Sequence, residues 1–405
     1  MASICSIIPH YLLKTIIDKG EADDDIVAEC RSTLAQVNQL QTARIEHSHQ
    51  IALASQGLAQ ESAGVQGFIP PHIHQAILRG PAGEEEREAS RRTLEHDTKF
   101  RTARRRERHL SRTVYDAQHR WSFTRDKILI PEGGPLLDKK IDPSTDGNEC
   151  YIGFGKTYDF YLEYFNRDSL DNQGLPLDGF VHYGQNFGNA FWDGEKMVFG
   201  DGSRLFNGLT DELDVIGHEL THGVVQHTCN LKYEFQSGAL NESLADVFGI
   251  MVKQWGENPD KPQTAAEANW LIGEGIWRQG INGRALRDME NPGTAFDDPI
   301  IGKDPQPAHW KDFVVLPNTK EGDWGGVHIN SGIPNRAFVL ASKKIGGLAW
   351  LGAGQIWYKA ISSGELNGEA KFKKFADVTI KYSGEHAKDV QKAWEEVGYP
   401  FPERG

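Results

Sequence analysis

Residues 212–228 read Glu-Leu-Asp-Val-Ile-Gly-His-Glu-Leu-Thr-His-Gly-Val-Val-Gln-His-Thr. The apolar positions in this stretch suit a helix with one buried side; they include Val215, Leu220 and Val224. His218 and His222 are four residues apart, so on a helix they share one face and lie one turn from each other. Two imidazoles placed in this way can bind one zinc ion. The stretch therefore predicts a metal-binding helix.

Three nearby acidic residues complete the predicted site. Glu219 lies about 100° round the helix from His218, so it can reach a metal-bound water without binding the metal. Glu242, in a segment expected to begin a second helix near Asn241, can supply a third ligand and leave a fourth position open, as catalytic zinc sites do. Asp246 shares the face of Glu242 and can accept the free N–H of one ligating histidine, while Asn241 can accept the other.

A second histidine follows a Gly-rich turn, in Asp323-Trp324-Gly325-Gly326-Val327-His328. Asp323 could orient His328, which would then donate a hydrogen bond to a developing oxyanion. A histidine that merely starts a helix is the other reading of this pattern, and the residues alone leave both open.

These features resemble the thermolysin family of metallopeptidases over residues of about 113–405. The short N-terminal segment and the lack of a signal peptide are more similar to the protealysin branch. The motifs that carry the resemblance are Val114-Tyr115-Asp116-Ala117, Asn189-Ala190-Phe191-Trp192, Gly217-His218-Glu219-Leu220-Thr221-His222-Gly223, Ser237-Gly238-Ala239-Leu240-Asn241-Glu242-Ser243, Leu286-Arg287-Asp288-Met289 and Gly325-Gly326-Val327-His328-Ile329-Asn330-Ser331-Gly332. The resemblance implies an α+β, two-lobe metalloprotease fold, with a β-rich N-terminal lobe, a central zinc-binding helix and a helical C-terminal lobe.

The resemblance also implies the catalytic roles. Zinc would bind His218, His222 and Glu242, with Glu219 as general base and proton shuttle. Tyr233 and His328 match the pair that stabilises the oxyanion, with Asp323 supporting His328.

The substrate-binding residues come from the same resemblance. Asn189 and Ala190 match the edge strand that aligns the substrate backbone, and Arg287 matches the residue that binds the carbonyl after the scissile bond. The pocket for the next side chain would be lined by Phe206, Leu209, Val215, Ile272 and Leu286. All five are apolar, so we expect cleavage before Leu, Phe, Ile or Val.

One family feature is expected to be missing. Thermolysin-like enzymes often carry a double calcium site, which Asp214, Asp260 and Glu274 still fit. Lys253 and Leu271 stand where carboxylates are expected, and a Lys ammonium could replace a cation by pairing with Asp214. The double calcium site is therefore predicted to be absent, while calcium elsewhere stays open.

The chain divides into three predicted parts. Residues 1–112 form a small helical prosegment, which ends in a basic run over residues 99–112. It contains two similar copies, at about 6–44 and 67–104, each read as a Pro-initiated short helix followed by a longer one. Residues 113–228 form the β-rich catalytic lobe that ends in the zinc-binding helix, with one helix over 158–170 and a hairpin at Asp193-Gly194. Residues 229–405 form the mainly helical lobe.

Composition limits the partners and the location. The 405-residue chain has a net charge of −13, which argues against nucleic acid, and no apolar run is long enough to span a membrane. The N-terminus lacks the pattern of a secretory signal, so we expect a cytoplasmic protein, with leaderless secretion as an alternative. The cysteines show no paired metal-type spacing, which indicates reduced thiols. A monomer is expected.

The sequence predicts a zinc-dependent neutral endopeptidase, made as a latent, self-processed precursor. Its own prosegment would be an inhibitor or folding aid, and self-cleavage would fall near the basic run, before Leu110 or Val114. The alternative is a catalytically silent regulatory or binding protein on a protease scaffold. An aminopeptidase would need an acidic anchor on the substrate-aligning strand, where Asn189 and Ala190 stand instead.

Overall fold

The computed structural model describes residues 5–58, 110–140, 145–257 and 259–402. The described residues up to Ile45 pack in one compact unit with those from Leu110 onward. The second prosegment copy and most of the basic run lie outside the described residues.

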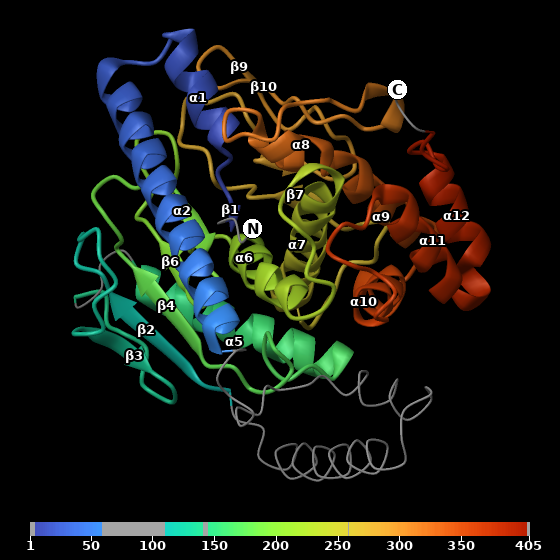
Figure 1. Cartoon of the computed structure of the whole chain (residues 1–405), viewed down its shortest axis with the longest axis horizontal. Coiled ribbons are helices and arrows are strands. Elements are labelled where there is room, and N and C mark those ends of the chain that lie inside the picture. Colours follow the sequence, from blue (N-terminus) through green and yellow to red (C-terminus); the bar gives the residue numbers. More distant parts are fainter. Residues whose placement is uncertain (1–4, 59–109, 141–144, 258, 403–405) are drawn as a thin grey trace. The chain divides into compact units, whose positions relative to one another are not determined.

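A six-stranded sheet forms one side of this unit (Figure 1). Its strand order is β1-β5-β6-β4-β2-β3, in which β6, β4 and β2 are parallel and the other pairs antiparallel. The predicted hairpin at Asp193-Gly194 is confirmed, since it joins β5 to β6. The strands are β1 (Cys5–Ser6), β2 (Arg112–Asp116), β3 (Ile128–Pro131), β4 (Leu177–Val181), β5 (Ala190–Trp192) and β6 (Met197–Phe199). β1 comes from the N-terminal segment, so this segment extends the sheet of the catalytic lobe.

Helices cover both faces of the sheet. α5 (Asp146–Phe165) lies so close to β4 that a Cβ added at Gly179 would be 2.6 Å from Cys150 Sγ. Successive strand residues alternate between faces, and Phe180 on the opposite face packs in a cluster with Val37 of α2 (Asp24–Leu58). α5 is the helix that was predicted over 158–170; it begins earlier, at Asp146, and ends at Phe165.

The other lobe is mainly helical, as predicted. α6 (Leu213–Gln226) ends the β-rich lobe, and α7 (Phe235–Glu257) is the first helix of the helical lobe. Both lie between the sheet and the remaining helices (Figure 1). The later helices are α8 (Asp323–Asn330), α9 (Gly332–Ile345), α10 (Ala353–Ser362), α11 (Phe372–Tyr382) and α12 (Ala387–Glu395). Two small antiparallel sheets lie in the chain between α7 and α8. One pairs β7 (Leu271–Ile272) with β8 (Arg287–Asp288), and the other pairs β9 (Asp297–Asp298) with β10 (Gly302–Lys303).

The expectation that a second helix begins near Asn241 was wrong by two turns. α7 starts at Phe235, and it is buried from Ser237 onward. Gly238 there packs directly on α8, because an added Cβ would lie 2.4 Å from Val327 Cγ1. Tertiary contact of this kind, rather than local sequence, sets where α7 begins.

The first prosegment copy has the predicted helix pair. α1 (His10–Lys19) follows Pro9 and ends at Gly20, whose φ of 66° is the left-handed conformation that favours glycine. The inner face of α1 is fully buried, through Leu12, Leu13 and Ile16. α2 then runs on as the longer helix.

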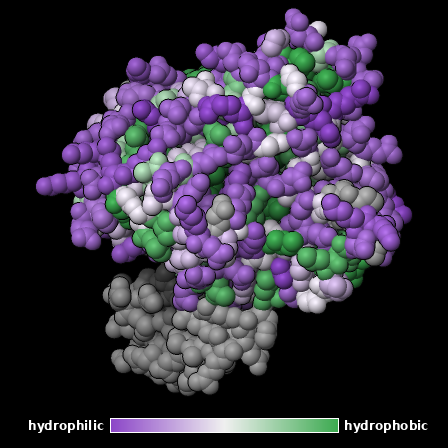
Figure 2. Space-filling model, turned by 180° about the vertical axis from the view of Figure 1, so that it is seen from behind, coloured by the Kyte–Doolittle hydropathy of each residue, from purple (hydrophilic) through white to green (hydrophobic). Residues whose placement is uncertain are grey.

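The surface shows no large apolar face on the side seen in Figure 2, where hydrophobic residues form only small patches between hydrophilic ones. Among the described helices, none combines the length and the apolar character that crossing a membrane requires.

Candidate active site

Two glycines allow the helices of the site to cross in backbone contact. A Cβ at Gly249 of α7 would lie 2.6 Å from the Asp214 carbonyl oxygen and 2.9 Å from the His218 nitrogen of α6. A Cβ at Gly217 of α6 would in turn lie 3.1 Å from the Gly249 Cα. The close crossing places one turn of each helix against the other in the interior.

His218, His222 and Glu242 meet at this crossing, and all three are buried. The two Nε2 atoms are 3.1 Å apart, and the Glu242 oxygens lie 3.5 Å from His218 Nε2 and 3.6 Å from His222 Nε2. Ligands at zinc-bond lengths in a tetrahedron are separated by about 3.3 Å. Glu242 Oε2 is buried without a hydrogen-bond partner. The donor set therefore fits one zinc ion.

The far sides of both imidazoles are held in place. His218 Nδ1 lies 2.8 Å from Asp246 Oδ1, and His222 Nδ1 lies 2.9 Å from Asn241 Oδ1. Such partners fix the orientation of a ligating histidine and leave its Nε2 for the metal. Burial also lowers the pKa of His222 to about 4, which favours the neutral, ligating form.

Asp246 is itself anchored by residues from two other elements. It accepts hydrogen bonds from Arg287 Nε at 2.9 Å and Nη2 at 2.8 Å, and from Asn335 Nδ2 at 2.8 Å. Burial alone would raise the pKa of Asp246, but Arg287 and His218 hold it well below the usual range. Asp246 is therefore a charged carboxylate that supports the histidine. Asn335 was not predicted, and its position 89 residues away offered no local signal.

Glu219 lies beside the three donors and is fully buried. Its Oε2 accepts the Trp192 N–H at 2.9 Å, while Oε1 has no hydrogen-bond partner. Burial and the neighbouring Glu242 raise the pKa of Glu219 well above its usual value. A dication bound next to it would lower that pKa, so the carboxylate can act as a base in the metal-loaded site.

His328 approaches the donors from α8. Trp324, Gly325 and Gly326 have positive φ, and this turn lets Asp323 reach back to His328, with Oδ1 2.6 Å from Nδ1 and Oδ2 2.8 Å from the backbone nitrogen. Burial would lower the pKa of His328, but Glu242 and Asp323 raise it to about 9. A protonated His328 can donate from Nε2.

Tyr233 and Gln306 lie next to this histidine. The Tyr233 hydroxyl is 3.0 Å from His328 Nε2 and donates to Glu242. Gln306, which the sequence did not point to, donates to the His328 carbonyl at 2.7 Å. The arrangement places two hydrogen-bond donors next to the metal-ligand group.

The predicted substrate-binding residues already contact part of the chain itself. β1 pairs antiparallel with β5. Asn189 Oδ1 accepts the Ile8 N–H at 3.0 Å, and Asn189 Nδ2 donates to the Ile8 carbonyl at 3.0 Å. The N-terminal segment therefore pairs with the strand that is predicted to align the substrate.

The five predicted pocket residues are all buried and belong to one hydrophobic cluster with Ile7. They are Phe206, Leu209, Val215, Ile272 and Leu286. Arg287, predicted to bind a substrate carbonyl, pairs with Asp246, and its remaining Nη1 is buried without a hydrogen-bond partner. One donor of Arg287 is thus left for a ligand.

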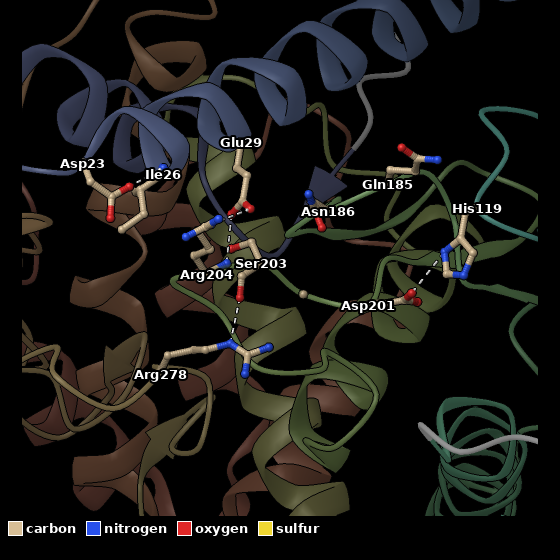
Figure 3. A pocket seen from close by; sticks show the side chains of 11 residues that line it. Asp23, Ile26, Glu29, His119, Gln185, Asn186, Asp201, Ser203, Arg204 and Arg278 are labelled. Atoms are coloured by element: carbon tan, nitrogen blue, oxygen red, sulfur yellow. Dashed lines mark hydrogen bonds and ion pairs between the residues drawn. The ribbon is translucent and has the colours of Figure 1, made fainter.

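The prosegment makes a second, polar contact away from the donors. Arg204 is 2.8 Å from Asp25 and 3.4 Å from Glu29 of α2, and its backbone N–H donates to Glu29 at 2.9 Å. Figure 3 shows Arg204 and Glu29 along a groove between α2 and the loop that carries Ser203. These ion pairs are solvent-exposed, unlike the buried contacts at the donors.

The Lys253 ammonium lies beside Asp214, the residue with which the sequence suggested it could pair. Its Nζ is 2.8 Å from Glu212 Oε2 and 3.5 Å from Asp214 Oδ1. Asp260 is exposed and Leu271 lies in β7. The ammonium supplies positive charge beside Asp214.

A buried pair of helix-borne histidines, a glutamate that could complete a metal site with them and a second buried glutamate beside them are typical of a zinc metallopeptidase. Two family descriptions match the sequence: "Thermolysin metallopeptidase, catalytic domain" over residues 85–226, and "Thermolysin metallopeptidase, alpha-helical domain" over residues 229–399. The chain belongs to the thermolysin family of metallopeptidases and is a metalloendopeptidase.

Relatives of known name support the protealysin-like branch. The chain is 44% identical over 354 residues to an extracellular metalloprotease of Pectobacterium carotovorum subsp. carotovorum, covering 84% of this chain and 97% of that protein. It is 41% identical over 354 residues to protease PrtS of a Photorhabdus strain, covering 84% and 93%. The solved structure of the precursor of protealysin from Serratia proteamaculans matches with a TM-score of 0.66 and 44% identity, covering 82% of this chain and 99% of that one.

Proposed function

We propose that this metalloendopeptidase binds its zinc through His218, His222 and Glu242 and is made as a latent precursor. The observation that carries the proposal is the convergence of three buried donor atoms beside Glu219, which has one oxygen without a hydrogen-bond partner. A bound zinc ion lowers the pKa of its water and polarises the scissile carbonyl.

The chain's own residues supply the rest of the chemistry. Glu219 takes the water proton and delivers it to the leaving amine. His328 and Tyr233 donate hydrogen bonds to the developing oxyanion, and Asp323 orients His328 through its Nδ1. Asn189 and Ala190 align the substrate backbone, and Arg287 binds a carbonyl with its free Nη1.

The pocket supports cleavage before bulky apolar residues. Its five lining residues are apolar and buried, so a charged substrate side chain would lose its hydration there without gaining a partner. The pocket already shares its hydrophobic cluster with an isoleucine, Ile7.

The latent form is supported by the N-terminal residues. β1 and Ile8 use the hydrogen-bonding groups of β5 and Asn189 that a substrate backbone would need. Substrate binding at this strand therefore requires that residues 5–8 leave.

We further propose that residues 1–112 are a prosegment with two copies. The Pectobacterium relative is covered over 97% of its length but covers only 84% of this chain, which leaves about 65 of the 405 residues. The two copies are about 60 residues apart, as from Thr33 to Thr93. The extra length matches one additional copy.

Self-cleavage before Val114 is disfavoured by the fold. Val114 is buried in β2 between Ile130 of β3 and Gly179 of β4, where a protease cannot reach the backbone without opening the sheet. Leu110 is only partly buried and precedes the strand, so it is the better of the two predicted positions.

We also propose that Lys253 replaces the double calcium site. Its ammonium lies between Glu212 and Asp214, so a divalent cation at the same place would be repelled.

Casein hydrolysis by the matured protein tests the function. We expect cleavage that a chelator abolishes and added zinc restores, with cuts before Leu, Phe, Ile and Val in a peptide library. Zinc-loaded, matured protein without activity would instead favour a silent binding protein.

A further inference from the structure

We propose that the chain cleaves its own Ser6–Ile7 peptide bond inside the cleft, and that the part beginning at Ile7 stays bound after the cut. This inference rests on the proposed function, because the same residues would perform the hydrolysis. The N-terminal segment would then be the first substrate of the enzyme as well as its inhibitor.

The segment lies in the cleft as an added strand. Cys5 pairs with Trp192 and Ser6 with Phe191, in antiparallel register. The Ile7 N–H donates to the Ala190 carbonyl at 3.2 Å, and Asn189 makes the two hydrogen bonds to Ile8 described above. Main-chain pairing of this kind fixes which peptide bond faces the catalytic groups.

The two ends of the Ser6–Ile7 bond face the groups that hydrolysis needs. The Ser6 carbonyl oxygen lies 3.2 Å from His328 Nε2, the proposed oxyanion donor. On the other side of the same bond, the Ile7 nitrogen lies close to the Glu219 carboxylate, although its N–H donates to the Ala190 carbonyl. The carbonyl thus meets the donor, and the amide nitrogen meets the group that would protonate it.

The side chain after this bond is apolar and fully buried. Ile7 belongs to the same large hydrophobic core as the five pocket residues. It is one of the apolar residues before which cleavage is expected. Ser6 is buried as well, with 6% of its surface exposed, so an external protease cannot reach the bond in the folded chain.

The reaction is a simple hydrolysis. Water adds its oxygen to the Ser6 carbonyl carbon, and the bond between that carbon and the Ile7 nitrogen breaks. Glu219 transfers one proton from the water to the nitrogen, and the second proton follows from the new carboxyl group. The products are a Ser6 carboxylate and an Ile7 ammonium, with no co-reactant other than water.

The contacts that remain explain why the cut would not release the prosegment. Leu12, Leu13 and Ile16 of α1 stay buried, and Asn189 still holds Ile8. The new Ile7 ammonium would lie next to the Glu219 carboxylate, a favourable pair of charges. Residues up to Ser6 lose their covalent link to α1 and can leave. The trimmed chain therefore remains latent, and activation requires a later cut.

The test follows the N-terminus of the full chain loaded with zinc, by intact mass and N-terminal sequencing. We expect the wild type to begin at Ile7 and the Glu219→Gln variant to keep residues 1–6 apart from normal methionine removal. The rate should not depend on protein concentration, and added active enzyme should leave the Ser6–Ile7 bond of the Glu219→Gln chain uncut. In that variant the Ile7 and Ile8 amides should exchange hydrogen slowly.

A pair of matched substitutions adds a control. Ile7→Ala should slow the cut at least about 10-fold, because the pocket loses most of the side chain. Ile17→Ala, the same change on α1 away from the bond, should leave the rate within about 3-fold. Equal effects of the two variants would overturn the proposal.

The other outcomes are decisive as well. A Ser6–Ile7 bond that stays intact in protein whose matured form hydrolyses casein would overturn the inference and leave the proposed function standing. A cut in the Glu219→Gln chain, or a rate that rises with concentration, would also overturn it. A trimmed chain with full activity would refute the claim that residues from Ile7 onward stay bound. If the zinc-loaded protein showed no trimming and its matured form hydrolysed no casein, the proposed function itself would be rejected.

Discussion

The metal-ligand region on α6 and α7 differs from the contact between the prosegment and the catalytic lobe. At the helix crossing every ligand is buried, and each histidine has a partner that is itself held by other elements, as Asp246 is by Arg287. The prosegment combines backbone pairing along β5 with exposed ion pairs at Arg204. The difference indicates that the three metal-binding side chains are held by the catalytic part of the chain, whereas the prosegment makes separate contacts that can be lost.

The largest expected effect comes from the base. Glu219→Gln removes the proton acceptor and keeps the shape of the side chain, so activity of the matured enzyme should fall by at least about 1,000-fold. Zinc content, measured by mass spectrometry, should be unchanged, because Glu219 is not a ligand. Near-normal turnover in a pure sample would rule out this role.

The support behind the ligands should have the next largest effect. Asp246→Asn weakens the partner of His218 and leaves Arg287 without its counter-charge, so zinc affinity should fall by about 100-fold. Competition with a chromogenic chelator measures this. Asp126→Asn, in an exposed ion pair on the catalytic lobe, is the control and should keep the affinity. An unchanged affinity in the Asp246 variant would mean that the metal region does not depend on its buried network.

The stability of the folded chain should depend on pH through Asp214, which is buried on α6, and this dependence distinguishes the buried region from the exposed contact. Burial, opposed by Lys253, raises the pKa of Asp214 to about 7 in the folded state, against about 3.9 in the unfolded chain. The folded state therefore prefers the neutral acid, and this stabilisation is lost as pH rises through 7. Between about pH 5.5 and pH 8 the wild type should lose about 2 kcal/mol relative to Asp214→Asn.

Denaturant unfolding at each pH measures that difference, with both proteins carrying Glu219→Gln to prevent self-digestion. A difference that is flat across the range would show that Asp214 stays ionised beside Lys253.

The smallest effect is expected at the exposed contact. Arg204→Ala removes ion pairs in which Arg204 is 53% and Asp25 69% exposed, and such pairs contribute less than about 1 kcal/mol. The activity of the uncut chain on a fluorogenic peptide should therefore rise by less than about 5-fold. Arg120→Ala, at another exposed pair, should not change it. A much larger rise would show that the Arg204 contact, rather than the strand in the cleft, maintains latency.

One expectation from the sequence failed, and one candidate cleavage position is disfavoured, for a related physical reason. α7 begins at Phe235 and not near Asn241, because it is buried from Ser237 onward, with Gly238 packed against α8. Val114, a candidate for self-cleavage, lies in the interior of the sheet. In both cases the pattern near the residue was compatible with a loop or an accessible site, and packing against distant elements decided otherwise.

The sequence by itself determined the fold class and pointed to the three side chains that could hold a metal, because helical spacing and apolar periodicity are local properties that show in neighbouring residues. Only the tertiary structure decided which residues occupy the cleft, and that Asn335, Gln306 and the Trp192 backbone support the site. Backbone hydrogen bonds such as that of Trp192 can be made by almost any residue, and the side-chain contacts join positions far apart in the chain, so neither leaves a pattern in a single sequence.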